Sequence, residues 1–124
     1  MKALLSSKVL VYFVVLLFLR SCEVNQPPSC NISAPTDGFR AVKGDVIAVS
    51  VRADDEEGDI TEVRLLLNKS ALVSLDYPFD YEINTAKFTP GNYSIEAIAV
   101  DKEGLQSRDE VDFILHPTGW NSPD

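Results

Sequence analysis

The sequence predicts an all-β protein, an antiparallel β-sandwich of about seven strands with Greek-key connections. Three observations predict it. Short apolar segments alternate with polar residues at a period of two, turn-forming residues recur about every ten positions, and no segment shows the apolar period of a helix. With 124 residues, 45% of them hydrophobic, the chain is long enough to form one domain around its own core.

The clearest predicted strand lies between the turns Pro90–Gly91 and Asp101–Gly104. Its alternate positions are apolar and share one face of the strand: Tyr93, Ile95, Ala97 and Ala99. A strand of this kind needs a hydrogen-bonding neighbour on each side, so we expect the other strands to be arranged around it.

The remaining strands are predicted in chain order from the same alternation. They are residues 29–34, 39–42, 46–53, 60–67, 71–75, 79–84 and 105–115. The segment 39–42 is short and suits an edge position. Turn signals such as Pro35–Gly38 and Asn68–Ser70 separate the strands. Cys30 falls among the apolar positions of the first strand and is interpreted as a small core residue.

Residues 1–21 are predicted to be a lipoprotein signal peptide. The unbroken apolar run Val9–Leu19 is too short to cross a bilayer, which takes about 20 residues, but it has the length of a signal-peptide apolar region. The tetrapeptide Leu19-Arg20-Ser21-Cys22 resembles a bacterial lipobox, in which the cysteine thiol is acylated. This resemblance implies lipidation of Cys22 and a lipid-anchored location in the cell envelope, on the outer membrane or cell surface. The alternative is an ordinary secretory signal followed by an incidental cysteine.

The rest of the chain divides into three parts. Residues 22–28 are expected to be a tether, because the pair Pro27–Pro28 favours extended chain. Residues 29–116 form the predicted sandwich domain. Residues 117–124 show no periodicity and are predicted to be a flexible tail.

Composition excludes several function classes. The net charge of −8 disfavours nucleic acid and anionic lipid surfaces as partners. The one histidine, His116, lies beyond the last predicted strand, and the sequence contains no nucleophile, phosphate-binding or metal motif. We therefore expect no enzyme activity and no obligatory cofactor.

The acidic loops are the one candidate site in the sequence. Asp55, Glu57 and Asp59 lie between two predicted strands, and Asp101 begins a later turn. In a sandwich these two loops share one end. The carboxylates could hold calcium, a hard cation that prefers oxygen ligands. Alternatively, Asp55 and Asp101 could cap their own turns by accepting hydrogen bonds from backbone amides.

From about Gln26 to Leu115, the chain resembles bacterial Ig-like domains of the group related to PKD and cadherin-like modules. The resemblance is carried by Ala34-Pro35-Thr36-Asp37-Gly38, by Ala53, Asp55, Gly58 and Ile60, by Pro90-Gly91-Asn92-Tyr93, and by Ala97 to Asp101. It implies an accessory, repeat or adhesive module of a cell-surface protein or carbohydrate-active enzyme, without catalytic activity of its own.

Together these features predict a non-catalytic cell-envelope lipoprotein that acts as a protein-interaction, adhesion or structural module, with another envelope protein as partner. The alternative is an accessory module, carbohydrate- or calcium-binding, that works with an extracellular hydrolase. Carbohydrate binding is the weaker expectation, because the aromatic residues outside the predicted core faces are scattered: Phe39, Tyr77, Phe88 and Trp120.

Overall fold

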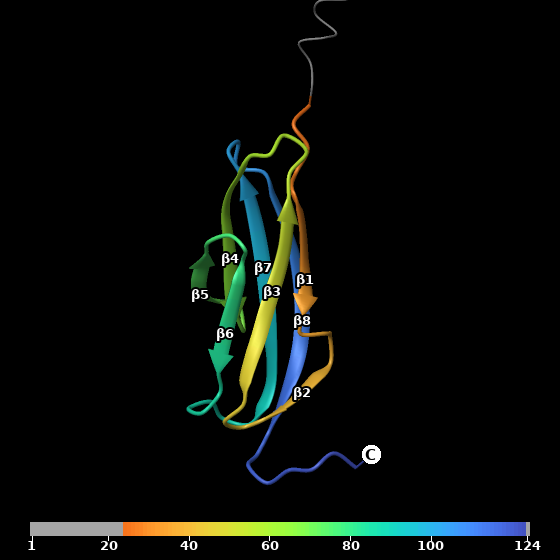
Figure 1. Ribbon diagram of the computed structural model, residues 1–124, viewed down its shortest axis with the longest axis vertical. Helices are drawn as coiled ribbons and strands as arrows, with labels where there is room; N and C mark the ends of the chain where they lie inside the picture. Colours follow the sequence, from red (N-terminus) through yellow and green to blue (C-terminus); the bar gives the residue numbers. More distant parts are fainter. Residues whose placement is uncertain (1–23, 124) are drawn as a thin grey trace, which may run out of the picture.

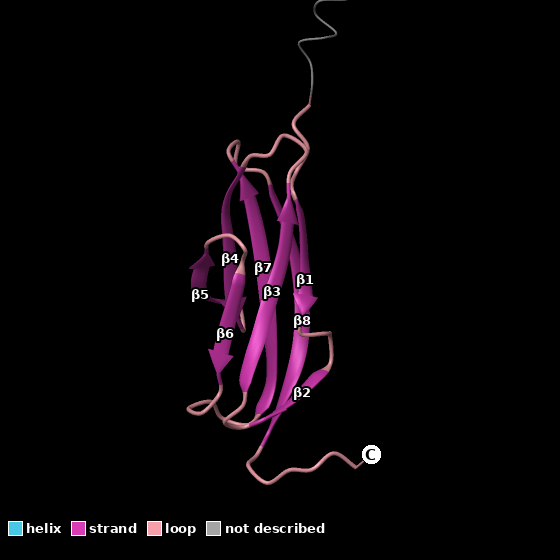
Figure 2. Ribbon diagram, viewed as in Figure 1, coloured by secondary structure: helices cyan, strands magenta, loops and turns pink. Residues whose placement is uncertain are grey.

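The protein is a sandwich of two β-sheets, seen in a computed structural model that describes residues 24–123 (Figure 1). Its strands are β1 (Ser29–Ala34), β2 (Phe39–Val42), β3 (Val46–Asp54), β4 (Ile60–Leu67), β5 (Ser70–Leu75), β6 (Asp80–Asn84), β7 (Gly91–Asp101) and β8 (Gln106–His116). The part of the chain that is described consists of strands and loops without a helix (Figure 2), which confirms the predicted all-β class. Within it, no helix has the length and apolarity needed to cross a bilayer.

The strands form a three-stranded sheet in the order β1-β3-β6 and a five-stranded sheet in the order β2-β8-β7-β4-β5. Strand β7 is the centre of the larger sheet and pairs antiparallel with β4 and β8. This strand is the one that the alternation of the sequence predicts most clearly. The expectation that neighbours flank it on both sides is confirmed.

The core lies between the sheets and consists of the alternate residues that the period of two predicts. From β7, Ile95, Ala97 and Ala99 are each 0% exposed. They pack with buried side chains of the other strands, which include Val49, Val51, Val63, Leu65, Ile83, Phe113 and Leu115. A well-packed aliphatic core of this kind supplies most of the driving force for folding.

One pair of strands departs from the expected antiparallel pattern. β2 runs parallel to β8, with Phe39 opposite Phe113 and Ala41 opposite Leu115. The turn at Pro35–Gly38 carries the chain from the edge of the small sheet to the edge of the large one. Gly38 N donates to Asp112 O of β8 over 2.8 Å, and this bond places β2 beside β8. With β2 counted, the sandwich has eight strands.

The outer face of the large sheet buries two residues that the alternation places on the solvent side. Glu96 is only 4% exposed because Lys69 and Arg108 lie over its carboxylate, with Nζ and Nη1 at 3.3 and 3.7 Å from Oε2. Ile98 is 6% exposed and lies opposite Arg64 on β4 and Arg108 on β8. The long stems of these basic residues cover apolar surface while their charged ends stay in water.

An aromatic stack closes the core at the end where β7 begins. The Tyr93 ring stacks on Phe113 with centroids 5.2 Å apart, and Phe88 packs on Tyr93 at 5.5 Å. The Tyr93 hydroxyl donates to the carbonyl of Thr89, four residues upstream. This bond fixes the chain where it passes into β7 and resembles the tyrosine corner of Ig sandwiches.

Tyr93→Phe should therefore lower the free energy of unfolding by about 1 kcal/mol, the usual net value of one intramolecular hydrogen bond. The phenyl ring keeps its packing, so the slope of a urea unfolding curve should not change while the midpoint falls. Tyr77→Phe is a suitable control, because Tyr77 is 85% exposed. Equal midpoints for Tyr93→Phe and the unmodified chain would show that the bond contributes nothing.

Candidate functional site

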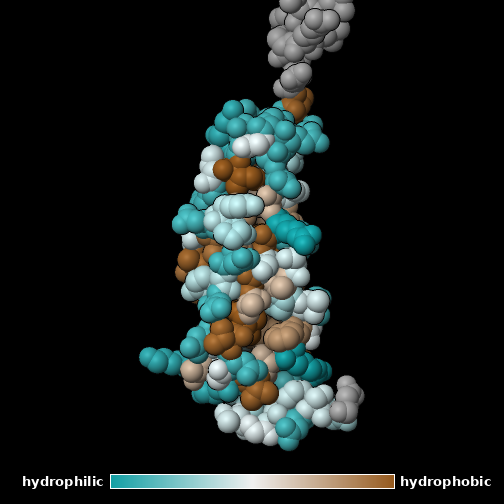
Figure 3. Space-filling view, viewed as in Figure 1, coloured by the Kyte–Doolittle hydropathy of each residue, from teal (hydrophilic) through white to brown (hydrophobic). Residues whose placement is uncertain are grey.

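The acidic residues gather at one end of the sandwich, which we call the acidic pole. It comprises Asp54, the β3–β4 loop 55–59, Asp101 and the β7–β8 loop 102–105. Hydrophilic atoms cover this end of the molecule (Figure 3), and the described chain begins beside it at Val24 (Figure 1). The prediction that the two loops share one end is confirmed by a direct bond, in which Lys102 N donates to Asp59 O over 3.0 Å.

Asp55 and Glu57 form a pair of carboxyl groups within the β3–β4 loop. Asp55 Oδ1 accepts the backbone N–H of Glu57 over 2.8 Å, which is the turn-capping bond expected from the sequence. Asp55 Oδ2 is buried without a donor among the described residues. A hydrogen bond with the Asp55 side chain raises the pKa of Glu57, because two carboxyl groups can share a hydrogen bond only when one of them is protonated.

Asp101 is the most enclosed carboxylate of the acidic pole, with 2% of its surface exposed. Its Oδ1 accepts the backbone N–H groups of Glu103 and Leu105, each over 2.9 Å, so the turn-capping interpretation is confirmed here as well. Its Oδ2 accepts Asn25 Nδ2 over 2.7 Å. Burial alone would raise the pKa of Asp101, but these donors outweigh burial and lower it.

Asn25 is a site residue that sequence reasoning missed. It belongs to the segment expected to be a tether, yet its side chain is bound to the buried Asp101, and Pro28 just after it is buried. The contact joins residues 76 positions apart. No local sequence pattern predicts such a contact, because an asparagine shortly before Pro-Pro is equally typical of a free linker.

Asp59, the fourth carboxylate of the predicted calcium site, is bound to a cation of the protein itself. Lys102 Nζ lies 3.0 Å from Asp59 Oδ2, and this pairing raises the pKa of Lys102. The ion pair joins the two loops of the acidic pole. Because both side chains are partly exposed, we regard it as a positioning contact rather than a major source of stability.

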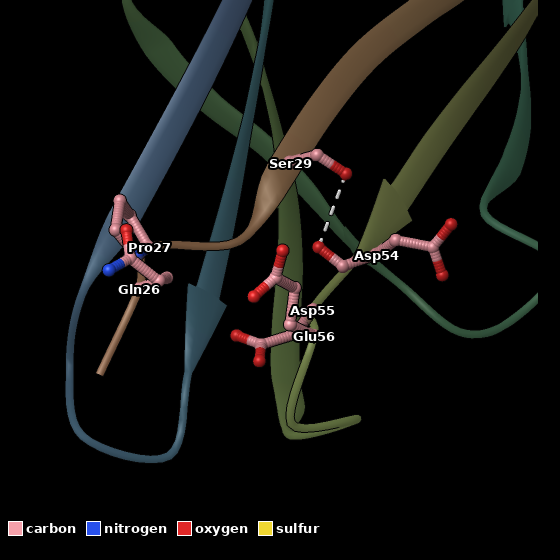
Figure 4. Close-up of a pocket in the computed structure, with 6 residues that line it drawn as sticks. All are labelled: Gln26, Pro27, Ser29, Asp54, Asp55 and Glu56. Atoms are coloured by element: carbon pink, nitrogen blue, oxygen red, sulfur yellow. Dashed lines mark hydrogen bonds between the residues drawn. The ribbon is translucent and has the colours of Figure 1, made fainter. Parts of the chain in front are cut away.

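An open hollow of about 660 Å³ lies beside these loops, lined by Gln26, Pro27 and Ser29 on one side and by residues 54–56 on the other. In Figure 4 the Asp55 and Glu56 side chains point toward the side of Gln26, while the Asp54 carboxylate points away. Ser29 Oγ donates to Asp54 O over 3.2 Å and joins β1 to β3 at this edge.

The structure thus brings Asp55 and Glu57 together but gives Asp59 and Asp101 other partners. Within residues 24–123, no group of three or more histidine, cysteine, aspartate or glutamate side chains has the arrangement of a metal site. Calcium binding by Asp55, Glu57, Asp59 and Asp101 stays a prediction, and it would require rearrangement of the bonds that these carboxylates make.

The structure describes one of the two cysteines of the chain, Cys30. Cys22, the predicted lipidation site, lies outside the described residues. Cys30 is a free, half-buried thiol that packs against the core, with Sγ 3.6 Å from the carbonyl of Ala97. Burial raises the pKa of the Cys30 thiol, so the group is less reactive than an exposed cysteine.

At the opposite end of the sandwich, the residues after β8 turn back on the domain. The Trp120 ring stacks on His116 with centroids 3.6 Å apart and planes 4° from parallel. His116 Nε2 lies 3.2 Å from Arg40 Nη1, so the imidazole accepts a hydrogen bond from the guanidinium. Residues 117–120 therefore have contacts that the absence of periodicity did not reveal.

Asp101→Asn should lower the melting temperature at pH 7 by about 5 °C or more, because a charged acceptor of three hydrogen bonds is lost. Folding lowers the pKa of Asp101. Its stabilising contribution is therefore complete above the pKa of an unfolded aspartate, about 3.9, and is lost as the pH falls through the folded value. The difference between the variant and the unmodified chain should shrink on acidification from pH 7 to pH 3.

Asp54→Asn is the matched control for this titration, because Asp54 is exposed and its carboxylate points away from the Asp55 and Glu56 side chains (Figure 4). Thermal unfolding followed by circular dichroism gives both melting temperatures. A pH-independent difference for Asp101→Asn would contradict the proposed contribution of its charge.

The calcium prediction has its own measurement. If the four carboxylates bind calcium in the native state, the melting temperature should rise progressively with millimolar calcium and should return to its starting value with chelator. Asp55→Asn should abolish the rise, and sodium chloride at matched ionic strength should not reproduce it. Identical melting temperatures with calcium and with chelator would contradict calcium binding at the acidic pole.

Comparisons with known proteins place the chain among Ig-like modules. A family model described as a bacterial Ig domain matches residues 28–97, more than half of the chain. Fibronectin(III)-like modules of Clostridium thermocellum CbhA are 23% identical with a TM-score of 0.69, over 82% of this chain and 53% of theirs. The chain thus spans about half the length of that structure. A search of curated proteins finds no match.

Two further solved structures share the fold. The PKD1 domain of Vibrio anguillarum Epp is 16% identical with a TM-score of 0.56, over 76% of this chain and 99% of that domain. Carbohydrate-binding modules of the β-sandwich superfamily are 18% identical with a TM-score of 0.60, over 82% of this chain and 39% of theirs. At these identities the likeness establishes the Ig-like sandwich and leaves the ligand open.

Proposed function

Because the chain belongs to the bacterial Ig domain family, we propose that it is a non-catalytic module of the cell envelope, anchored by lipid at Cys22 and binding another envelope protein. The observation that carries the proposal is the combination of a single small sandwich with the lipobox-like Leu19-Arg20-Ser21-Cys22 in the segment that precedes it. The fold provides a rigid body for display, and the cysteine provides an attachment point.

The position of the first described residues supports this proposal. Asn25 lies three residues after Cys22 and is bonded to the buried Asp101 at the acidic pole. An extended chain spans about 3.3–3.6 Å per residue, so the domain would be held within about 11 Å of its anchored cysteine. A short connection of this kind suits a module that is presented in a fixed orientation at a surface.

The contacts of His116 and Cys30, both within residues 24–123, fit a binding role. Among residues 24–123, the one histidine ring is stacked on Trp120 and bonded to Arg40, and the half-buried thiol of Cys30 has a raised pKa. Neither group is arranged as a nucleophile with a neighbouring base, which is the geometry that covalent catalysis needs.

The second candidate function is an accessory module that works with an extracellular hydrolase. The likeness to carbohydrate-binding modules favours it. A glycan array probed with the purified chain distinguishes the two functions, because a protein-interaction module gives no signal on sugars. Capture of specific glycans would move the assignment to the accessory role.

Cys22→Ala should release the chain from the membrane fraction into the soluble envelope fraction of a bacterial host, because acyl chains at this residue are the only proposed anchor. Fractionation followed by immunoblotting measures the distribution, and mass spectrometry of the unmodified chain should show the acylated cysteine. Cys30→Ala is the control and should stay with the membrane. Retention of Cys22→Ala in the membrane fraction would contradict lipid anchoring.

A further inference from the structure

An open groove crosses the outer face of the large sheet at the end opposite the acidic pole. It has a volume of about 390 Å³. Its lining residues are Gly38, Asn68, Asn92, Tyr93, Ser94, Asp112, Phe113 and Ile114. The register between β7 and β8 explains why these residues lie together. Asn92 lies opposite Ile114 and Ser94 lies opposite Asp112 across the pairing of β7 with β8, so these four side chains share one face.

The groove presents hydrogen-bonding groups that the rest of the described chain does not use. The side chains of Asn92 and Asp112 are exposed and have no hydrogen bond to any of residues 24–123. Asn68 Oδ1 accepts Ser94 N over 2.9 Å, which fixes the Asn68 amide and leaves its NH₂ group as a donor. The carboxylate can accept hydrogen bonds from the hydroxyl groups of a ligand, and the two amides can donate hydrogen bonds to them.

An aromatic ring lies beyond the residues that line this groove, on the side of His116. Ile114 of the groove floor is followed two residues later on the same face of β8 by His116, at a distance of about 7 Å along the strand. Arg40, which lies opposite Ile114, bonds to His116 through Nη1. His116 in turn supports one face of Trp120, and the indole keeps part of its surface in solvent.

We propose that this groove is a binding site for a neutral oligosaccharide. Asn92, Asp112 and the Asn68 amide hydrogen-bond to sugar hydroxyls, and Trp120, held flat against His116, packs against a sugar ring at the end of the groove. Polar groups that fix orientation, combined with an aromatic contact surface, are the usual construction of a small-molecule site. This proposal rests on the second candidate function, the accessory module, and not on binding of an envelope protein. Lipidation at Cys22 is not required for it, so failure of the anchor and failure of the sugar site are separate results.

Charge distinguishes a neutral glycan from an acidic one. Asp112 lines the groove, and Asp37 Oδ1 accepts the backbone N–H of Asp112 over 2.8 Å, so a second carboxylate lies beside this residue. The guanidinium of Arg40 is one opposing charge, and it is bonded to His116. With a net charge of −8 on the whole chain, a uronate polymer is repelled on approach.

The test uses the one tryptophan of the chain as a reporter. The full chain in mild detergent is titrated with cellohexaose and with mannohexaose, and Trp120 fluorescence and heat of binding are recorded. We expect a saturable change with at least one of these sugars and none with oligogalacturonate of equal length. No saturable change with either neutral hexamer, or tighter binding of oligogalacturonate, overturns the proposal.

Variants locate the site. Asn92→Ala and Trp120→Ala should each weaken binding measured by calorimetry by about tenfold or more, as loss of one good contact does. Two matched controls should leave the affinity unchanged: Asn31→Ala, at an exposed asparagine on β1 of the other sheet, and Tyr77→Ala, at an exposed ring that does not line the groove. Binding that survives both groove variants, or that falls equally in the controls, overturns the proposal. Circular dichroism checks that each variant is folded.

Discussion

The close approach of the two sheets over the middle of β7 is the constraint on which the rest of the structure depends. Ala97 and Ala99 present only methyl groups to the core and are fully buried. Their small size lets β1 come near enough for Cys30 Sγ to lie 3.6 Å from the Ala97 carbonyl. A larger residue at either position would force the sheets apart, because a close-packed interior has no spare volume for added methylenes.

The same strand positions both candidate sites. β7 ends at Asp101, whose carboxylate binds the β7–β8 turn and Asn25. Near its start at Gly91, it carries Asn92 and Ser94, which line the groove. Six residues of paired strand, 95–100, separate Ser94 from Asp101, so the relative position of the two regions is fixed by the sheet rather than by flexible loops. The loops add only the ends of each site, such as Asp55 and Glu57 at one pole and Trp120 at the other.

The sequence predicted those parts of the structure that depend on short-range pattern. Alternation predicted the strands and the inward residues of β7, and the position of Asp55 and Asp101 in turns predicted their capping bonds. Contacts that join distant segments were out of reach. The burial of Glu96 depends on Lys69 and Arg108, which come from a turn and from another strand. The bond from Asn25 to Asp101 and the stacking of Trp120 on His116 likewise become visible only when register and turn geometry are known.

The acidic pole and the groove lie at opposite ends of the domain, and this placement would matter for a membrane-anchored module. The described chain begins at the acidic pole and ends at the other end of the sandwich (Figure 1). With Cys22 in a bilayer, the Asn25–Asp101 bond would keep the acidic pole close to the headgroups, where the repulsion of like charges opposes tilting of the domain onto an anionic surface. The groove around Asn92 and Asp112 would then face away from the membrane, where a long polymer has free access. In that arrangement the acidic loops would act as the base that orients the domain, and the polar face at the far end, around Asn92 and Asp112, would be the part open to the proposed ligand.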